Sequence, residues 1–220
     1  THKAVDYLMK SGDKCFKMYS VDESHQYFQQ AFDLLKDFTE KTIETNEMMI
    51  DLLNRWALVY YHSGNSRNAE QLFSSQRYLI DQVNDKEKIG MFYAWWGNIL
   101  WVEGEYLKAY DYLKKAEKIG IEINNQKVIG YACTWLSWVD AELGRFDEGL
   151  DYGDRAIEIG ENLKEDPYIY FKAHGGKGYN YFWMGHAKGP KEIGEKLIQY
   201  GNKYSQIRSV SLGYINKAYG

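Results

Sequence analysis

The sequence predicts an all-α protein, built as a linear array of antiparallel helix pairs. The glycines Gly64, Gly104 and Gly144 are 40 residues apart, and Gly185 follows 41 residues later. Around each of these glycines, small and bulky residues recur at the same offsets. Self-similarity at a fixed period of this size is typical of repeat architectures, in which each repeat is a helical unit that buries its apolar face against its neighbours.

The composition is that of a globular chain. Of the 220 residues, 45% are hydrophobic, 26% are charged and only 2 are proline, which argues against a disordered chain. The net charge is −4 and the Lys and Arg residues are scattered, whereas a nucleic-acid interface needs a concentrated basic face. No apolar run reaches the roughly 18 residues of a membrane span, and the first ten residues lack the apolar stretch of a secretion signal. We therefore expect a cytoplasmic protein that binds neither nucleic acid nor membrane.

The two cysteines, Cys15 and Cys133, are far apart and form no C-x-x-C pair. This usage suits a reducing compartment, in which free thiols persist. Free cysteine is among the most buried residue types, so both are expected in the core.

The register of the repeats predicts how the helices pack. The segments LLNRWALVYYHSGNSRNAEQLF from Leu52, FYAWWGNILWVEGEYLKAYDYL from Phe92 and ACTWLSWVDAELGRFDEGLDYG from Ala132 align without gaps. Small residues lie seven positions before the turn glycine and five positions after it, and bulky ones lie eight positions before it. The small residues before the turn are Ala57, Gly97, Ser137 and Gly178, and those after it are Ala69, Ala109 and Gly149. The bulky residues are Trp56, Trp96 and Leu136. The small residues let two helices approach closely, and the bulky ones fill the space beside them.

This pattern predicts eleven helices within a single repeat domain over residues 1–220. In order, we expect them at 4–18, 22–38, 45–63, 66–83, 86–103, 106–123, 126–143, 146–163, 167–185, 188–203 and 206–219. The repeats are about 4–38, 45–83, 86–123, 126–163 and 167–204, with a partial repeat over 206–220. Ser66, either Asn84 or Asp85, and Asp166 suit N-cap positions, and Pro167 suits the first position of a helix. In the degenerate first repeat, Tyr19 takes the place of the turn glycine.

The big-and-small signature resembles the tetratricopeptide repeat over nearly the whole chain. The stretches W-A-L-V-Y-Y-H-S-G and W-G-N-I-L-W-V-E-G-x-Y-x-x-A carry the resemblance. The period of 40 is longer than the usual 34, and the proline that usually closes each repeat is missing. The resemblance implies a right-handed superhelical solenoid. The long period also resembles the repeat regions of large bacterial signalling proteins, such as nucleotide cyclases and regulatory ATPases. Because the last expected helix is cut short, we expect the chain to be a fragment of a longer protein.

A second glycine series lies sixteen residues past the turn, at Gly120, Gly160 and Gly201. A glycine inside a helix costs about 1 kcal/mol relative to alanine. Three in register therefore indicate a compensating close contact with the following helix. The alternative is that they mark fraying helix ends, since glycine is also common at helix C-termini.

The first helix of each repeat has two faces with different expected roles. One is a packing face that includes Trp56 and Trp96, because residues at i, i+3, i+4 and i+7 share a side. The other face resembles the lining of the concave groove in tetratricopeptide arrays, and it holds the expected partner-binding residues. These are Asn54, Arg55, Tyr61, Trp95, Asn98, Trp101, Tyr131, Trp135, Trp138, Tyr179, Phe182 and Trp183. The alternative is that the aromatic rings among them are buried between neighbouring repeats.

The function expected from this face is non-catalytic binding of an apolar peptide or helix of a protein partner. The alternative function is a regulatory or sensory segment of a multidomain bacterial signalling enzyme, which acts on its own catalytic domains or binds a small inducer. Self-association through the groove or the chain ends is also compatible with the pattern. A clamp for a peptide carboxylate is disfavoured, because only Asn54, Arg55 and Asn98 offer suitable groups.

No motif for catalysis, metal or cofactor binding stands out. The segment His174–Gly178 lacks the spacing of a phosphate loop and falls within a helix, which suggests a loosened or groove-opening first helix instead. The five histidines form no H-x-x-x-H pair. We therefore expect no enzyme activity and no cofactor.

Overall fold

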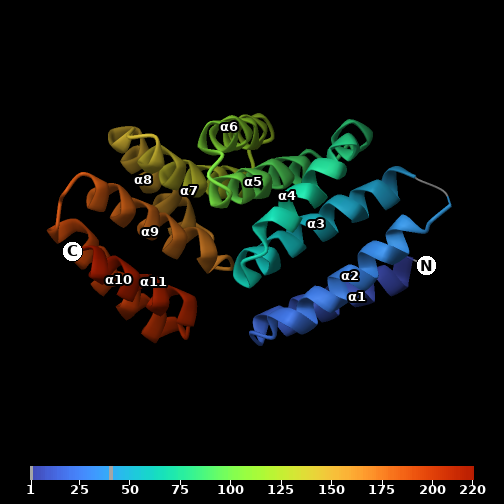
Figure 1. Ribbon diagram of the computed structural model, residues 1–220, viewed down its shortest axis with the longest axis horizontal. Coiled ribbons are helices and arrows are strands. Elements are labelled where there is room, and N and C mark those ends of the chain that lie inside the picture. Colours follow the sequence, from blue (N-terminus) through green and yellow to red (C-terminus); the bar gives the residue numbers. More distant parts are fainter. Residues whose placement is uncertain (1, 40–41) are drawn as a thin grey trace. The chain divides into compact units, whose positions relative to one another are not determined.

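The computed structural model describes residues 2–39 and 42–220, and over these residues it contains α-helices and one 3-10 helix but no strand. The chain forms two compact units, Thr1–Gly104 and Glu105–Gly220, called here the N-terminal and C-terminal units. Figure 1 follows the helices along the chain from the N-terminus in blue to the C-terminus in red. None of the described helices is long and apolar enough to cross a membrane.

Over its described residues, the N-terminal unit consists of two helix pairs in chain order, followed by the first helix of the next repeat. Its elements are α1 (His2–Lys17), α2 (Val21–Lys36), α3 (Ile43–Ser63), α4 (Ser66–Ser75), the 3-10 helix η1 (Arg77–Gln82) and α5 (Lys86–Val102). Helix α2 packs between α1 and α3, and α3 also packs against α5. The helices α1, α3 and α5 are the first helices of their pairs.

The C-terminal unit continues the same alternation. Its helices are α6 (Tyr106–Glu122), α7 (Gln126–Glu142), α8 (Phe146–Asn162), α9 (Pro167–Trp183), α10 (Lys188–Tyr204) and α11 (Ile207–Tyr219). Helix α7 packs against α6, α8 and α9, while α11 packs against both α9 and α10. Here α7, α9 and α11 are the first helices.

The helix bounds confirm the sequence prediction to within about two residues, with one exception. The helix expected over 66–83 ends at Ser75, and a 3-10 helix follows. Position 80, sixteen residues past Gly64, carries Ile where the later pairs carry glycine. The close helix approach that glycine permits is therefore not available at Ile80.

The turn glycines share one backbone conformation. Gly64, Gly104, Gly144 and Gly185 have φ values of 69°, 79°, 72° and 73°. This left-handed region is the one that glycine enters without steric cost. Tyr19 has φ 62°, which confirms that it takes the turn position of the first pair.

The second glycine series makes the close contacts that its register indicated. A Cβ atom at Gly160 would lie 2.7 Å from the backbone nitrogen of Tyr170. At Gly120 it would lie 2.8 Å from Ile129, and at Gly201 it would lie 2.5 Å from Val210. Each contact is to the following first helix, so the glycines bring α6, α8 and α10 against α7, α9 and α11.

The packing face is confirmed, because Trp56 and Trp96 are buried at 1% and 3% exposure. Cys133 is also buried, and burial raises the pKa of its thiol to about 12. The prediction for Cys15 was wrong in degree, because this thiol is only partly buried near the end of α1.

Candidate partner-binding surface

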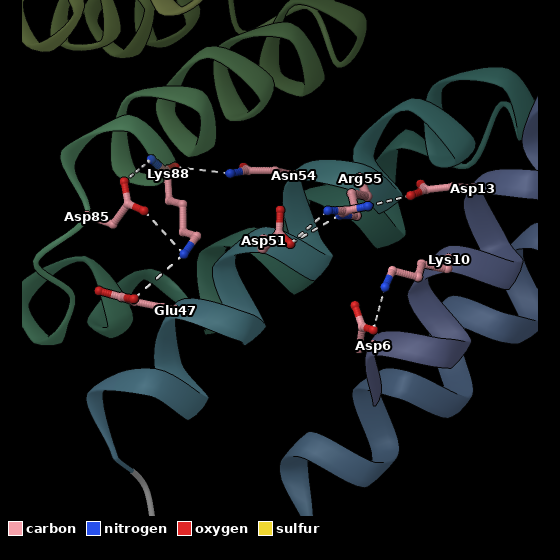
Figure 2. A network of polar contacts seen from close by, with 9 residues as sticks. All are labelled: Asp6, Lys10, Asp13, Glu47, Asp51, Asn54, Arg55, Asp85 and Lys88. Carbon is pink, nitrogen blue, oxygen red and sulfur yellow. Dashed lines mark hydrogen bonds and ion pairs between the residues drawn. The ribbon is translucent and has the colours of Figure 1, made fainter. Parts of the chain in front are cut away.

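The first helices of the N-terminal unit carry a network of charged side chains, drawn in Figure 2. Arg55 of α3 reaches across to Asp13 of α1 and forms an ion pair with it. Its guanidinium also pairs with Asp51, one turn earlier on α3, at 3.1 Å. A guanidinium suits this bridging role because its donors form a planar fork.

Lys88 is the second centre of this network, near the start of α5. Its ammonium lies 3.2 Å from Asp85 and 3.6 Å from Glu47 of α3. The Asp85 carboxylate also caps α5, because it accepts the backbone N–H of Lys88 at 3.1 Å. Burial alone would raise the pKa of Asp85, but the bonds from Lys88 outweigh it and the pKa is lowered.

The three groups named for a carboxylate clamp are therefore differently placed. Arg55 is engaged by two carboxylates, and the Asn54 amide donates to the Lys88 carbonyl at 3.0 Å. Asn98 is fully buried, and neither of its amide atoms has a hydrogen-bond partner among the described residues. An incoming carboxylate would have to displace Asp13 or Asp51 from Arg55, so this face is unsuited to a clamp.

The aromatic residues expected on the first helices of the N-terminal unit differ in exposure. Tyr61 and Trp101 are half-buried, whereas Trp95 is only 3% exposed. Trp95 therefore differs from the expectation of an accessible indole, because its ring is enclosed by packed side chains.

In the C-terminal unit, Trp135 and Trp138 of α7 are buried at 0% and 5% exposure. The Trp138 indole N–H donates to the Lys172 carbonyl at 3.1 Å. The Lys172 ammonium lies 4.9 Å from the Trp135 ring centre and 5.2 Å from that of Trp138. Neither indole is the accessible ring that the sequence suggested.

Two glycines of α9 explain the burial of Trp138. A Cβ atom at Gly175 would lie 2.9 Å from the Trp138 ring, and one at Gly176 would lie 3.0 Å from its indole nitrogen. The segment His174–Gly178 is thus regular helix whose missing side chains admit Trp138. It is not loosened, contrary to the expectation from its sequence.

The same aromatic stripe becomes accessible at the C-terminal end of α9. We call Tyr179, Phe182, Trp183 and Tyr219 the exposed aromatic cluster. Phe182 and Trp183 are 38% and 50% exposed, and Tyr179 and Tyr219 are half-buried. Phe182 stacks on Tyr219 of α11 at 4.7 Å between ring centres, and Tyr179 lies 5.9 Å from Trp183.

Tyr179 links this cluster to the buried rings. It stacks on Trp138 at 5.1 Å between ring centres, and its hydroxyl donates to the Glu142 carboxylate at 2.9 Å. Burial, followed by the bond to Glu142, raises the pKa of Tyr179 to about 12, so the hydroxyl stays protonated at neutral pH. Tyr179 therefore anchors the cluster to Trp138 and Glu142 of α7.

The remaining predicted residue, Tyr131, belongs to a separate contact. It stacks on Tyr168 at 5.5 Å and its hydroxyl donates to Asp166 at 3.0 Å. Sequence reasoning did not include Tyr219, because no turn glycine had been assigned to the last helix to give its register. It also did not foresee the ion pairs, although the Asp51–Arg55 spacing of four residues on one helix was a signal for one of them.

The fold resembles several solved repeat structures. The nearly identical TPR-like repeats of a Podosopora anserina kinesin light chain match with a TM-score of 0.63 at 11% identity, over 92% of this chain and 96% of that one. A Rap protein complexed with competence and sporulation factor matches at 0.61 and 17% identity, over 98% of this chain and 63% of that one. The fold is that of a tetratricopeptide-repeat array. This confirms the all-α solenoid of helix pairs that the sequence predicted.

A third similar structure is a signal-transduction ATPase with numerous domains from Pyrococcus horikoshii, which has a tetratricopeptide repeat sensor. It matches with a TM-score of 0.63 at 12% identity, over 95% of this chain. This tetratricopeptide-like chain spans 32% of that protein and 63% of the Rap protein. No family model and no curated protein sequence matches the chain.

Residues 2–39 and 42–220 bring together no group of three His, Cys, Asp or Glu side chains able to hold a metal ion. What the first-helix faces offer is a paired charged surface in one unit and exposed aromatic rings in the other.

Proposed function

We propose that the chain is a protein-interaction module that binds an apolar peptide or helix on the exposed aromatic cluster. The observation that carries this proposal is the exposure of Phe182 and Trp183 beside the half-buried Tyr179 and Tyr219. Trp183 is the one exposed indole among the seven tryptophans, all of which lie in the described residues. The likeness to a Rap protein solved with a bound factor supports the same class of function.

The cluster has the physical properties of a binding anchor. Tryptophan and tyrosine dominate the binding energy of protein interfaces, because they bury much apolar area with few rotatable bonds. The rings already contact one another and rest on Trp138, so little side-chain entropy remains to be lost on binding. An amphipathic helix would place residues at i, i+3 and i+4 against such a surface.

A displayed library of random peptides, panned against the chain, tests this proposal. We expect the recovered peptides to carry apolar residues at helical spacing. Their affinity should fall at least tenfold for Trp183→Ala and for Phe182→Ala, the size of effect typical of an interface anchor. Tyr7→Ala is the matched control, because Tyr7 of α1 is an exposed aromatic residue at 69% and lies outside the cluster. Equal loss in the control, or recovered peptides that are indifferent to both cluster variants, would refute the proposal.

A second candidate function is a regulatory or sensory segment of a larger signalling protein. The likeness to a protein with a tetratricopeptide repeat sensor, over 95% of this chain, favours it. In that case the surface would bind a catalytic domain encoded in the same reading frame. Sequencing that reading frame, and then titrating the neighbouring domain against the wild type and Trp183→Ala, separates the two functions.

Sedimentation at rising protein concentration tests whether a second copy of this chain occupies the same surface.

A further inference from the structure

A cavity of about 810 Å³ opens in the C-terminal unit, away from the exposed aromatic cluster. Residues from the end of α8, the start of α9, the second half of α10 and the turn before α11 line it. The cluster lies at the opposite end of α9, from Tyr179 to Trp183, together with Tyr219 of α11. The six lining residues that matter chemically are Lys164, Tyr170, Lys196, Tyr200, Lys203 and Tyr204.

The lysines give this cavity a positive charge within an acidic chain. Three ammonium groups, from Lys164, Lys196 and Lys203, stand against the single carboxylate of Glu161. None of the three has a carboxylate within ion-pair distance among the described residues. The contrast with Arg55 and Lys88 is direct, because each of those cations is held by two carboxylates.

The tyrosines form a continuous wall of rings between the lysines. Tyr170 and Tyr200 are 4.5 Å apart between ring centres, and Tyr200 and Tyr204 are 4.8 Å apart. The Lys196 ammonium lies 5.9 Å from the Tyr170 ring centre, and that of Lys203 lies 5.1 Å from the Tyr204 ring centre.

The tyrosine at the base of this wall is fixed in place. The backbone of Tyr170 lies so close to Gly160 that a Cβ atom there would be 2.7 Å from the Tyr170 nitrogen. Its ring is 4.4 Å from the buried His174 ring, and only 9% of Tyr170 remains exposed. Burial lowers the pKa of His174 to about 4, so this imidazole is neutral near pH 7 and adds no charge behind the cavity.

We propose that this cavity binds a small anionic ligand that carries a planar ring, of the nucleoside-phosphate class. The ammonium groups supply charge for the phosphates, and the tyrosine faces supply a stacking surface for the base. Lys196 and Lys203 are seven residues apart on α10, which separates their Cα atoms by about 10 Å along one helix face. The cavity volume falls in the range of small-molecule sites, about 300–1,000 Å³. This site is independent of the proposed peptide surface.

Calorimetric titration of the full chain with ADP, pyrophosphate and adenosine at low salt tests the proposal. We expect ADP to bind more tightly than either part alone, because only ADP engages both the lysines and the rings. Lys196→Gln/Lys203→Gln should weaken ADP binding about tenfold, and Tyr200→Leu by a similar factor. Added salt should weaken it further, since these lysines are exposed and screened.

The matched control is Lys118→Gln/Lys127→Gln, which removes the same charge from exposed positions of α6 and α7 outside the cavity. This control should bind ADP like the wild type, and a circular dichroism melt confirms that each variant folds. Absence of ADP binding at millimolar concentration would overturn the proposal. So would equal affinity for pyrophosphate, or equal weakening in the control.

Discussion

The same two register positions carry opposite chemistry in α3 and α9, one helix from each unit. Ten and nine residues before its turn glycine, α3 has Asn54 and Arg55, whereas α9 has Gly175 and Gly176. Arg55 bridges α1 and α3 through carboxylates, and its side chain is exposed. The glycines instead bring α9 against the Trp138 ring. At these two positions α3 therefore carries charged and paired groups, whereas α9 carries small residues packed against an indole.

This difference teaches that the repeat signature sets the fold and not the surface chemistry. The turn glycines and the small residues of the packing face are shared by both units. The positions beside them are free to vary, because they do not determine how a pair closes. Function must therefore be argued from those positions, residue by residue.

The largest effect expected from this comparison is on stability. Gly175→Ala/Gly176→Ala forces two methyl groups into space occupied by Trp138, Leu212 and Ser137. Overpacking of this kind costs typically 1–3 kcal/mol per site, and the contacts of 2.6–3.0 Å place both sites in the upper part of that range. Alanine returns about 1 kcal/mol of helix propensity per site, so we expect a net loss of about 3 kcal/mol. The matched pair Asn54→Ala/Arg55→Ala removes only partly exposed groups and should cost about 1 kcal/mol. Urea unfolding of the two double variants measures this, and equal losses would contradict the role given to the glycines.

A smaller effect concerns a buried carboxylate in the C-terminal unit, whose ion pair is longer than those of the N-terminal charged network. Asp140 of α7 is fully buried, neither of its oxygens has a hydrogen bond among the described residues, and the nearest guanidinium, of Arg145, is 3.9 Å away. Burial raises the pKa of Asp140 from 3.8 to about 6, although Arg145 opposes this. The folded state therefore binds the proton more tightly than the unfolded state does.

It follows that Asp140 lowers stability as pH rises from about 4 to 6, and that the full penalty is present above pH 6. We expect Asp140→Asn to be more stable than the wild type at pH 8, by about 2 kcal/mol, and nearly equal at pH 4. The free energies of unfolding of the two proteins must be compared at each pH, because the buried His174 makes the stability of both proteins rise with pH over part of this range. If the stability gain of Asp140→Asn over the wild type were the same at pH 8 as at pH 4, this account would be ruled out.

The smallest expected effect is in the charged network. Arg55, Asp13 and Asp51 are each about one third exposed, at 37%, 33% and 31% of their side chains. Arg55→Gln should therefore cost only about 0.5–1 kcal/mol in dilute buffer, and this cost should shrink in 1 M salt. Urea unfolding at both salt concentrations tests it. A cost that salt leaves unchanged would indicate packing of the Arg55 stem instead of charge pairing.

The sequence predicted the helix pairs well, because the signals that define them are local and periodic. Gly64 and Trp56 could be assigned from register alone, and the close contact of Gly160 followed from the cost of a glycine inside a helix. The burial of Trp138 could not be predicted in this way. It depends on residues of the next first helix, Gly175 and Gly176, whose lack of side chains lets Trp138 sink between α7 and α9.

Other features depend on contacts that spacing does not encode. The pairing of Arg55 with Asp13 joins residues 42 positions apart, and the stacking of Phe182 on Tyr219 joins different first helices. Lys196 and Tyr200 share a helix face with Lys203, but their meeting with Lys164 and Tyr170 required the packed structure. Periodicity predicts which face a residue occupies, whereas three-dimensional packing decides whether that face is open.

Acrylamide quenching of tryptophan fluorescence tests the central claim most directly, which is that the accessible aromatic surface lies at the end of α9. We predict that the wild type has a readily quenched component and that Trp183→Phe removes it, because the other indoles are buried or half-buried. Trp135→Phe should lower the shielded emission and leave the quenched component in place. The reverse result, with the quenched component lost in Trp135→Phe and kept in Trp183→Phe, would contradict the account.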